Sequence, residues 1–428
     1  MKTALVHDYL AQAGGAERVA AAFHTLFPKA PLYTSVYDPA ATLPSFAGMD
    51  IRTSFLQRWP FSSRRFHKLA LPYYPAAFER FNFSGYDLVL SSSSSFAKGI
   101  ITPPETCHIC YCHTPSRFVW RQQEYLSQNR SARAASSLVS AFVNSMRSWD
   151  VESAQRVDYF IANSYNVARR IRKFYRRDVA AVIYPPVETT KFHPVSPAEV
   201  GDHFLVVSRL ISYKRIDLAV EACTRRGLPL RVVGIGPDLT NLKRIAGPTI
   251  QFLGRLSDEQ VARELAHCKA LIFPGEEDFG ITPVECMASG RPVIAYGAGG
   301  ALETVVEKET GLFFSEQTVA SLVCALEEMD RHCFDPAALK ARASCFDTSV
   351  FQKQMLGLIG AALEEYRRSN SAACIDRKSL ERDKSHSLMP TLLAESFKPD
   401  YPETYAALHP NIGAQNLGAQ NLGTQNLA

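Results

Sequence analysis

The chain has 428 residues, enough for roughly two or three domains at about 150 residues each. With 46% hydrophobic and 21% charged residues it has the composition of a globular protein with full cores, and no apolar run approaches the ~18 residues of a membrane span. The first residues turn polar too soon for a signal peptide, so we expect a cytoplasmic protein. Ten cysteines are scattered, several of them inside apolar runs, which is typical of reduced, buried thiols.

The net charge of +5 conceals an asymmetry between the two halves of the chain. Residues 1–200 carry 23 Lys+Arg and 14 Asp+Glu, or +9, and residues 201–428 carry the remaining 24 and 28, or −4. Within the basic half, residues 55–81 interleave cations with aromatic rings. This mixture suits an anionic membrane surface, because rings settle at the headgroup level while Arg and Lys meet phosphates. The structural alternative is an amphipathic helix pair packed on a sheet. Nucleic acid is not expected, since no binding motif accompanies the run.

Apolar strand-like runs alternate with helical patterns, which predicts parallel sheets built from βαβ units. The strands expected in the first half are Thr3–His7, Pro31–Val36, Tyr86–Leu90, Cys107–Cys112, Tyr159–Ala162 and Val179–Ile183. After a Pro-rich connector the pattern restarts, with strands expected at Phe204–Val207, Leu230–Val233, Ile250–Phe252, Ala270–Phe273, Val293–Ala295 and Leu312–Phe314. We therefore expect two α/β domains whose sites lie at the carboxyl ends of the strands and in the cleft between them.

The expected boundaries follow from this pattern. An N-terminal domain over residues 1–185, a linker over 186–200 and a C-terminal domain over 201–348 precede a helix at 349–367, which we expect to pack back on the N-terminal domain. Residues 368–428 are polar and end in a five-residue Asn-Leu-Gly-Ala-Gln-type repeat. So few copies cannot bury a core, so we expect a disordered tail.

The segment 107–113, Cys-His-Ile-Cys-Tyr-Cys-His, superficially resembles a metal site. A strand would send Cys110 and Cys112 to one face and His113 to the other, and no second Cys/His pair follows at the spacing of a zinc ribbon. We therefore expect no metal here.

Two carboxylates lie eight positions apart after the predicted strand at Ala270–Phe273. Glu277 would lie in the loop after this strand, whereas Thr282-Pro283 predicts a capped helix start that places Glu285 in the first turns of the helix. A loop carboxylate beside helix N–H groups suits a polyhydroxylated, phosphorylated ligand. An ordinary βα connection with a solvated acidic patch is the alternative.

Other segments complete an ordered set. Gly14-Gly15 follows the first predicted strand, Arg209 and Lys214 flank a strand-to-helix junction, and residues 288–295 and 299–312 carry Ser-Gly-Arg-Pro and Gly-Gly-Ala-Leu-Glu. In this order the set resembles the retaining, nucleotide-sugar-dependent glycosyltransferases of family 4, over residues 1 to about 367. The resemblance implies the GT-B fold, two Rossmann-like domains facing across a cleft. Within the family the chain looks like bacterial mannosyltransferases that build O-antigen or exopolysaccharide on a lipid carrier.

The resemblance assigns donor contacts to the second half. Arg209 and Lys214 are five residues apart and would converge on the donor diphosphate, whose negative charge grows as the glycosidic bond breaks. Their alternative as surface cations is unattractive, because cations oppose the dipole at a helix start. Glu277 is assigned to the transferred sugar and Glu285 to the ribose hydroxyls. Backbone N–H groups expected to contact sugar or phosphate oxygens belong to Phe279, Gly280 and Ile281.

In the first half the resemblance points to the glycine loop and one histidine. Gly14 and Gly15 let the backbone approach the donor phosphate and the acceptor. His113 matches the family histidine that faces the reacting sugar, where we expect it to hydrogen-bond the sugar without an obligatory proton transfer. Arg117 and Trp120 are further candidates for the cleft.

The implied reaction is transfer of a hexose, expected to be mannose from GDP-mannose, to a polyprenyl-diphosphate-linked saccharide with retention of anomeric configuration. Glu277 could be the nucleophile, as in retaining glycosidases, but the family favours front-side attack assisted by the leaving phosphate. We expect no cofactor and no divalent cation. The alternatives are a UDP-sugar-dependent enzyme of the same fold, a GT-B nucleotide-sugar epimerase, and a non-catalytic carbohydrate- or membrane-binding protein. Peripheral association with the inner face of the cytoplasmic membrane would bring the enzyme to a lipid-linked acceptor.

Overall fold

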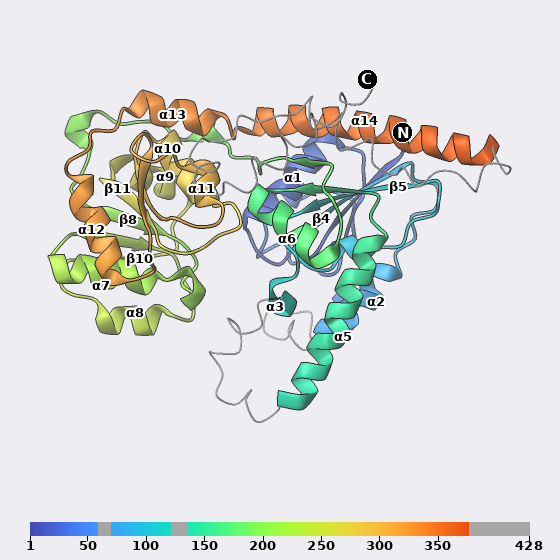
Figure 1. Ribbon diagram of the computed structural model, residues 1–428, viewed down its shortest axis with the longest axis horizontal. Coiled ribbons are helices and arrows are strands. Elements are labelled where there is room, and N and C mark those ends of the chain that lie inside the picture. The colour runs from blue at the N-terminus through green and yellow to red at the C-terminus, as the bar shows by residue number, and fades with distance from the viewer. Residues whose placement is uncertain (59–69, 121–135, 376–428) are drawn as a thin grey trace, which may run out of the picture. The chain divides into compact units, whose positions relative to one another are not determined.

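The chain forms two compact units. The computed structural model describes residues 1–58, 70–120 and 136–375 (Figure 1). Unit 1 contains residues 1–187 together with the described segment that begins at Phe346, and unit 2 contains residues 188–345. Unit 2 is thus inserted in sequence between two parts of unit 1.

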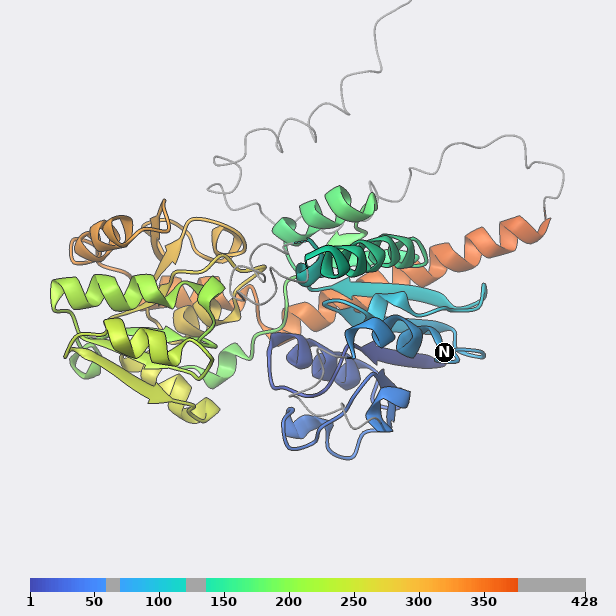
Figure 2. The ribbon, with the colours of Figure 1, turned by 90° about the horizontal axis from the view of Figure 1, so that it is seen from below.

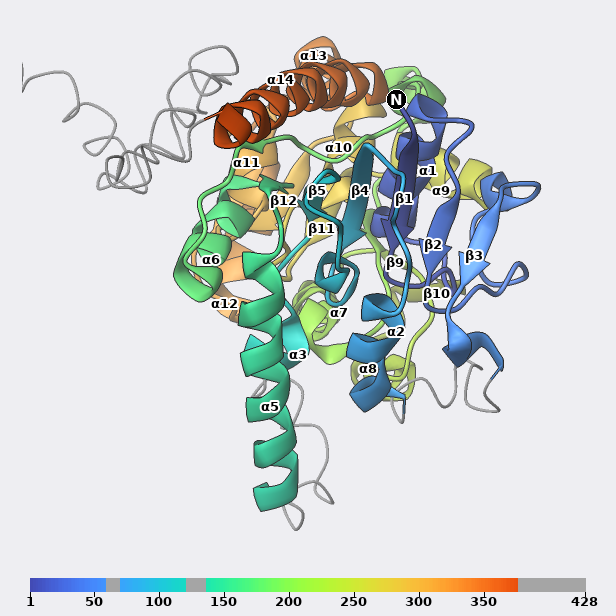
Figure 3. The ribbon, with the colours of Figure 1, turned by 90° about the vertical axis from the view of Figure 1, so that its right-hand side faces the viewer.

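Unit 1 is built on a seven-stranded parallel sheet in the order β3-β2-β1-β4-β5-β6-β7. Neighbouring β1, β4 and β5 can be followed side by side in Figure 3. The strands are β1 (Thr3–His7), β2 (Leu32–Thr34), β3 (Ile51–Thr53), β4 (Leu88–Ser93), β5 (Cys107–Cys112), β6 (Tyr159–Ala162) and β7 (Ala181–Val182). Strand order reverses direction between β1 and β4, which makes this pair the topological switch point of the sheet.

Helices cover both faces of this sheet. The set comprises α1 (Gly15–Leu26), α2 (Tyr74–Glu79), α3 (Arg117–Trp120), α5 (Ser136–Gln155), α6 (Tyr165–Tyr175) and α14 (Thr348–Ile375). One face packs against α1 and α14, and the other against α2, α5 and α6 (Figure 2). Since parallel strands buried on both faces need apolar side chains on both, near-continuous apolar runs are what the sequence shows here.

The C-terminal helix α14 completes the core of unit 1. The ring of Phe351 stacks on Phe23 of α1 and meets Tyr111 of β5 edge-on, each at 5.8 Å between ring centroids. The helix continues past residue 367, where we expected the tail to begin, and residues 376–428 of that expected tail lie outside the described residues.

Unit 2 has a six-stranded parallel sheet in the order β10-β9-β8-β11-β12-β13, with its switch point between β8 and β11. The strands are β8 (Phe204–Val207), β9 (Leu230–Val233), β10 (Ile250–Gly254), β11 (Ala270–Phe273), β12 (Val293–Tyr296) and β13 (Gly311–Phe314). Its helices are α7 (Ile216–Arg226), α8 (Leu239–Ile245), α9 (Asp258–His267), α10 (Ile281–Ala288), α11 (Ala301–Thr304), α12 (Val319–Met329) and α13 (Pro336–Ser344). One face of the sheet packs against α7, α8 and α12, whereas α9 and α10 lie on the other, with α11 and α13 against α10 (Figure 1).

The interleaved run over residues 55–81 is partly core. Tyr74 and Phe78 are 2% and 0% exposed and pack under the sheet of unit 1, whereas Tyr73 is 45% exposed. Those two buried rings are therefore not available to a membrane surface, as the helix-on-sheet alternative expected. Residues 59–69 of the run lie outside the described residues. In the parts of the chain that the structure describes, no helix combines the length and apolarity needed to cross a membrane.

Candidate functional site

The residues assigned to a donor lie at the switch point of the sheet in unit 2. The loop after β8 carries Arg209 and Lys214, and the loop after β11 carries Glu277. Because both strands end at the same edge of a parallel sheet, segments more than sixty residues apart in sequence emerge side by side. Sites were expected from the sequence at the carboxyl ends of the strands, and these three residues lie in loops at such strand ends.

Lys214 and Glu277 form an ion pair between the Nζ and Oε1 atoms, with side chains only 18% and 13% exposed. Both line a small pocket at the ends of β8 and β11, with Ser208, Phe273 and Gly275 among its walls. An ammonium and a carboxylate therefore share one recess. Such a pair can meet a ligand that carries both an anionic group and hydroxyl groups.

Glycines allow three loops to meet at this recess. A Cβ atom on Gly275 would lie 2.9 Å from the main-chain oxygen of Lys214. One on Gly299, whose φ is +64°, would lie 2.3 Å from the main-chain oxygen of Glu277. The N–H of Gly300 donates to that same oxygen at 2.9 Å. The main chain of Glu277 is consequently held by the 299–300 loop, which the sequence analysis singled out without a role.

Arg209 is exposed on a loop that two further glycines clamp. Cβ atoms on Gly234 and Gly236 would lie 1.8 and 2.1 Å from the main-chain oxygens of Ser208 and Leu210. Neither glycine was predicted from the sequence, although a Gly-x-Gly directly after the predicted strand at Leu230–Val233 is a signal that could have found them.

Helix α10 follows the loop of Glu277 but begins differently from the sequence prediction. Its N-cap is Gly280, with φ at +91°, and not Thr282, which lies inside the first turn. The left-handed conformation turns the chain sharply into the helix, and a side chain there would clash with Phe273, 2.9 Å from the position of a Cβ atom. Glu285 lies in this helix, as predicted, and is 6% exposed.

Unit 1 gathers two histidines at its own switch point. His7 ends β1, Ser92 is its register partner on β4, and His113 directly follows β5. The Ser92 hydroxyl lies 3.0 Å from His7 Nδ1 and 2.7 Å from His113 Nε2. His113 is 8% exposed, so most of its ring is enclosed by the unit. His113 was a candidate from the sequence, whereas His7 and Ser92 were not.

Gly14 is the N-cap of α1, and Gly15 is the first residue of this helix. The φ of Gly14 is −145°, which any residue can adopt, but a Cβ atom there would lie 2.8 Å from Oε2 of Glu17. Glu17 is 1% exposed and folds back under the loop. The structure therefore gives Gly14 a local reason to be glycine, beside the approach to a phosphate that the resemblance implies.

A buried carboxylate fixes the loop that follows β4. Asp8, 2% exposed, accepts hydrogen bonds from the main-chain N–H groups of Ser94, Ser95, Phe96 and Ala97 at 2.5 to 3.0 Å. Hydrogen bonds to a charged acceptor are the strong ones, so this loop is held firmly against β1.

The residue after this loop, Lys98, belongs to a buried ion pair. Its Nζ lies 2.6 Å from Oδ1 of Asp150 on α5, and the two side chains are 1% and 2% exposed. The other oxygen of Asp150 accepts a hydrogen bond from Nε1 of Trp120 at 2.7 Å. The pair thus ties α3 and α5 to the loop at the sheet edge.

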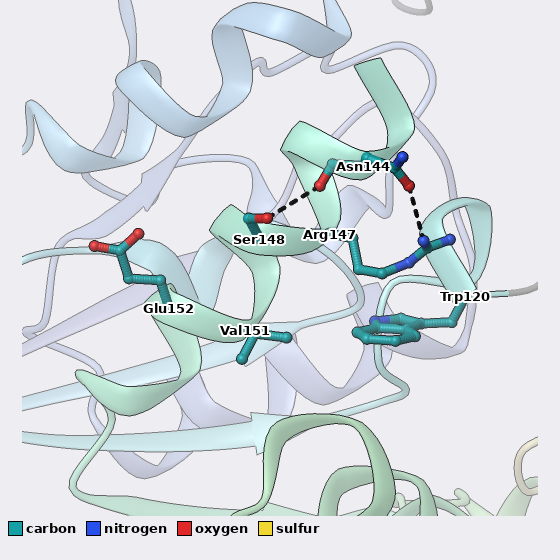
Figure 4. Close-up of a pocket in the computed structure, with 6 residues that line it drawn as sticks. All are labelled: Trp120, Asn144, Arg147, Ser148, Val151 and Glu152. Atoms are coloured by element: carbon teal, nitrogen blue, oxygen red, sulfur yellow. Dashed lines mark hydrogen bonds between the residues drawn. The ribbon is translucent and has the colours of Figure 1, made fainter. Parts of the chain in front are cut away.

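A second, more open pocket lies on the outer surface of α5 (Figure 4). Figure 4 shows Arg147 extending over Trp120, with Asn144, Ser148, Val151 and Glu152 along the helix. The Trp120 ring stacks on Phe174, with their ring centroids 4.4 Å apart, and the guanidinium carbon of Arg147 lies 5.4 Å from the centroid of the Trp120 ring. With its ring stacked and its N–H donated to Asp150, Trp120 acts here as a packing residue, and this pocket contains none of the residues assigned to a donor.

The Cys/His segment of β5 is part of the core. Cys107, Cys110 and Cys112 are at most 1% exposed, and burial raises the pKa of the Cys110 thiol to about 12. His108 is fully buried against Ser91, and burial lowers its pKa to about 3. Among the described residues no group of three or more His, Cys, Asp or Glu side chains is arranged to hold a metal ion.

Comparison with known proteins follows this division. The family model "Glycosyltransferase Family 4" matches residues 13–191, and "Glycosyl transferases group 1" matches residues 189–331. Anabaena HepE in complex with UDP has a similar fold, with a TM-score of 0.61 over 84% of this chain and 100% of that chain at 18% identity. Two Rossmann-like units with parallel sheets make up the GT-B fold. In this chain each unit has candidate residues at the switch point of its sheet.

Two named relatives are similar in sequence to shorter stretches of this chain. A GDP-mannose-dependent alpha-mannosyltransferase of Mycolicibacterium smegmatis is 36% identical over 127 residues, 29% of this chain and 33% of the relative. The human alpha-1,3/1,6-mannosyltransferase is 26% identical over 256 residues, 52% of this chain and 58% of the relative. The chain thus spans between a third and just over half of the length of these relatives. It belongs to glycosyltransferase family 4.

Proposed function

We propose that this protein is a retaining glycosyltransferase that transfers a hexose, mannose from GDP-mannose, to a lipid-linked oligosaccharide in the synthesis of a bacterial surface polysaccharide. The observation that carries the proposal is the half-buried pair of Lys214 and Glu277 at the switch point of unit 2. The two relatives named as mannosyltransferases support mannose as the sugar.

The pair offers two kinds of contact to a sugar nucleotide. Lys214 supplies a point charge to the diphosphate, with Arg209 as a second, planar cation on the same loop. Once a diphosphate competes for Lys214, the Glu277 carboxylate can accept hydroxyls of the transferred sugar and stabilise positive charge on its ring. Preorganised charge of this kind is worth most where it matches the charge that develops in the transition state.

Front-side attack fits this arrangement. The leaving diphosphate, held by Lys214 and Arg209, accepts the proton of the incoming acceptor hydroxyl on the same face of the sugar. The N–H groups of residues 279–281 precede and begin α10, where the positive end of the helix dipole favours an anion. Glu285 on the same helix is proposed to hold the ribose hydroxyls.

Unit 1 contributes the remaining residues of the proposal. His113 would hydrogen-bond the transferred sugar, and the Gly14-Gly15 loop would approach the donor phosphate and the acceptor. These roles come from the family, and the burial of His113 supports a fixed rather than a mobile position for its ring.

A panel of nucleotide sugars tests the donor. GDP-mannose should raise the melting temperature of the chain, because a ligand that binds only the folded state stabilises it. GDP-mannose should do so more than UDP-glucose or UDP-galactose at equal concentration. Stabilisation by the UDP-sugars alone would replace GDP-mannose in the proposal with a UDP-sugar, and the UDP complex of the fold relative makes this the second candidate.

Lys214→Met tests the ion pair. We expect turnover to fall by about 100-fold or more, the usual effect of removing one preorganised group from a developing charge. Lys243→Met is the matched control, since Lys243 is an exposed lysine on α8 of the same unit and should leave turnover unchanged. Full activity of Lys214→Met or of Glu277→Ala would overturn the site assignment.

The product separates the remaining alternatives. An epimerase would convert the donor without acceptor and yield no glycoside, and a binding protein would be stabilised by the donor without any turnover. A glycoside whose anomeric proton coupling matches that of the donor supports retention. An inverted product would exclude front-side attack.

We propose that no divalent cation is needed, because Lys214 and Arg209 can supply the positive charge that a metal ion supplies elsewhere. Turnover that is unchanged by a chelator supports this. Loss of turnover that added magnesium or manganese restores would contradict it.

Membrane association through residues 55–81 is proposed at the inner face of the cytoplasmic membrane. Cosedimentation with vesicles containing anionic lipid should be lost in the triple variant Arg64→Glu/Arg65→Glu/Lys68→Glu, since each cation near such a surface contributes about 1 kcal/mol. Binding that persists in this variant would exclude the run as the contact.

A further inference from the structure

Four buried side chains form a line across the switch point of unit 1. They come from α1, β1, β4 and the end of β5, and all are 8% exposed or less: Glu17, His7, Ser92 and His113. Glu17 Oε1 lies 3.7 Å from His7 Nε2, and the Ser92 hydroxyl bridges His7 Nδ1 and His113 Nε2. The two contacts of Ser92 are hydrogen bonds, whereas the contact between Glu17 and His7 is longer and electrostatic.

The serine in this line can donate in one direction only. Its hydroxyl has a single proton, so when both rings are neutral it donates to one ring and accepts from the other. In one order, Ser92 donates to Nδ1 of His7 and accepts a hydrogen bond from Nε2–H of His113. In the other order, Ser92 donates to Nε2 of His113 and accepts from Nδ1–H of His7. The two orders place the proton of neutral His113 on different nitrogens.

Glu17 selects between them. A carboxylate only accepts hydrogen bonds, and Oε1 already accepts one from Gln12 Nε2 at 3.1 Å. Its place in the first turn of α1 favours the negative charge through the helix dipole. The neutral ring of His7 therefore presents Nε2–H to Glu17, which leaves Nδ1 to accept from Ser92.

We propose that Glu17, through His7 and Ser92, sets the tautomer of His113, with the proton on Nε2 and the lone pair on Nδ1. Glu17, His7 and Ser92 are positioning residues, since they act through His113. Any hydrogen bond that Nδ1 makes in the neutral form is then accepted, not donated. Under the proposed function, on which this consequence rests, His113 accepts from a sugar hydroxyl and does not donate to a phosphate or a carbonyl oxygen.

Nuclear magnetic resonance of the full chain with ¹⁵N-labelled histidine tests the proton order without any donor. The spectra are recorded at pH 8.5, about two units above the ordinary pKa of histidine, because the ring nitrogens of a neutral histidine distinguish the tautomers. Signals of His7 and His113 are assigned by their loss in His7→Asn and His113→Asn. We expect both residues as the Nε2–H tautomer. A proton on Nδ1 of His113 in the unmodified chain would overturn the proposal.

Strand β4 supplies a matched control. Ser91, the neighbour of Ser92, makes an equivalent buried hydrogen bond to His108 at 2.8 Å. Ser92→Ala, which removes two buried Ser–His hydrogen bonds, should convert His113 to a mixture of tautomers, whereas Ser91→Ala, which removes one, should leave His113 unchanged. An unchanged His113 signal in Ser92→Ala would overturn the proposal, and if this variant does not fold, the unmodified chain still decides it.

Glu17→Gln tests the first member of the line. Its amide can donate as well as accept, so the order is no longer imposed and His113 should again become a mixture. In a turnover assay with a donor that the enzyme uses, Ser92→Ala and Glu17→Gln should lower kcat on the order of tenfold with a smaller change in KM, as expected when a group at the reacting centre loses its orientation. Ser91→Ala should stay near the unmodified rate. Because the spectra need no donor, failure of the proposed function and failure of this inference are separable.

Discussion

The buried ion pair between Lys98 and Asp150 gives a stability prediction whose size follows from its surroundings. The two side chains are 1% and 2% exposed, and the charged atoms lie 2.6 Å apart. Lys98→Met removes the cation and leaves the Asp150 carboxylate inside unit 1, with the Nε1–H of Trp120 still donating to it. Breaking a buried pair in this way costs about 3–5 kcal/mol, and we expect this loss in the free energy of unfolding.

The double variant Lys98→Met/Asp150→Leu should be more stable than Lys98→Met. It buries no charge, and the remaining cost comes from hydrogen-bonding groups that lose a partner, those of Trp120, Tyr175 and Ser95 among them, at about 1–3 kcal/mol for each group. The two substitutions are therefore strongly non-additive.

Tryptophan fluorescence during urea unfolding reports on unit 1, because Trp120 and Trp149 lie in this unit and residues 188–345 contain no tryptophan. Arg172→Met is the control: its ion pair with Asp178 is 69% exposed on both sides, so the unfolding midpoint should not move. If Lys98→Met costs less than about 1 kcal/mol, or if the double variant is as unstable as the two single costs added together, the reasoning from burial is refuted.

Two further predictions concern a glycine and a histidine. Gly299→Ala and Gly254→Ala place alanine at similar left-handed backbone angles, +64° and +71°, so each should lower the free energy of unfolding by about 1 kcal/mol. Only Gly299→Ala pushes against the main chain of Glu277, so it alone should also weaken donor binding in the thermal-shift assay. Equal effects of the two variants on donor binding would contradict the role given to the 299–300 loop. Burial lowers the pKa of His108 from 6.5 to about 3, so as the pH falls the unfolded chain binds a proton at this residue before the folded chain does. The free energy of unfolding of unit 1 should therefore fall by about 2 kcal/mol between pH 6.5 and pH 5 through this group alone. His108→Gln should flatten that pH dependence of the urea midpoint, and an unchanged slope would exclude His108 as its source.

The strands could be predicted because apolar runs in a two-sided parallel sheet have few alternatives. Six of the predicted strands, Thr3–His7 among them, have the bounds that the structure gives. The sequence prediction ended β4 at Leu90, because serine is a weak strand former. The structure continues the strand through Ser93, since β1 and β5 pair with it on both sides. The edge strand β3 was missed, being three residues long and only partly buried.

The candidate site was predictable where one loop carries the signal and not where partners are distant. Glu277 and Lys214 stand out through their own motifs. Ser92 lies in a run of five serines that looks uniform, and only the register of β4 against β1 and β5 shows which hydroxyl meets a histidine. Gly280 replaced Thr282 as the helix cap because a left-handed turn, invisible in the residue pattern, precedes α10.

Helix α14 has a consequence for the synthesis of the chain. The strands of unit 1 are made before unit 2, and the helix that completes unit 1 is made after it. Until Phe351 emerges, the apolar faces of Phe23 and Tyr111 have no cover from this helix. Unit 2 can therefore finish folding while the core of unit 1 is still incomplete. Truncation before residue 346 should leave unit 1 prone to aggregation even though every strand of its sheet is present.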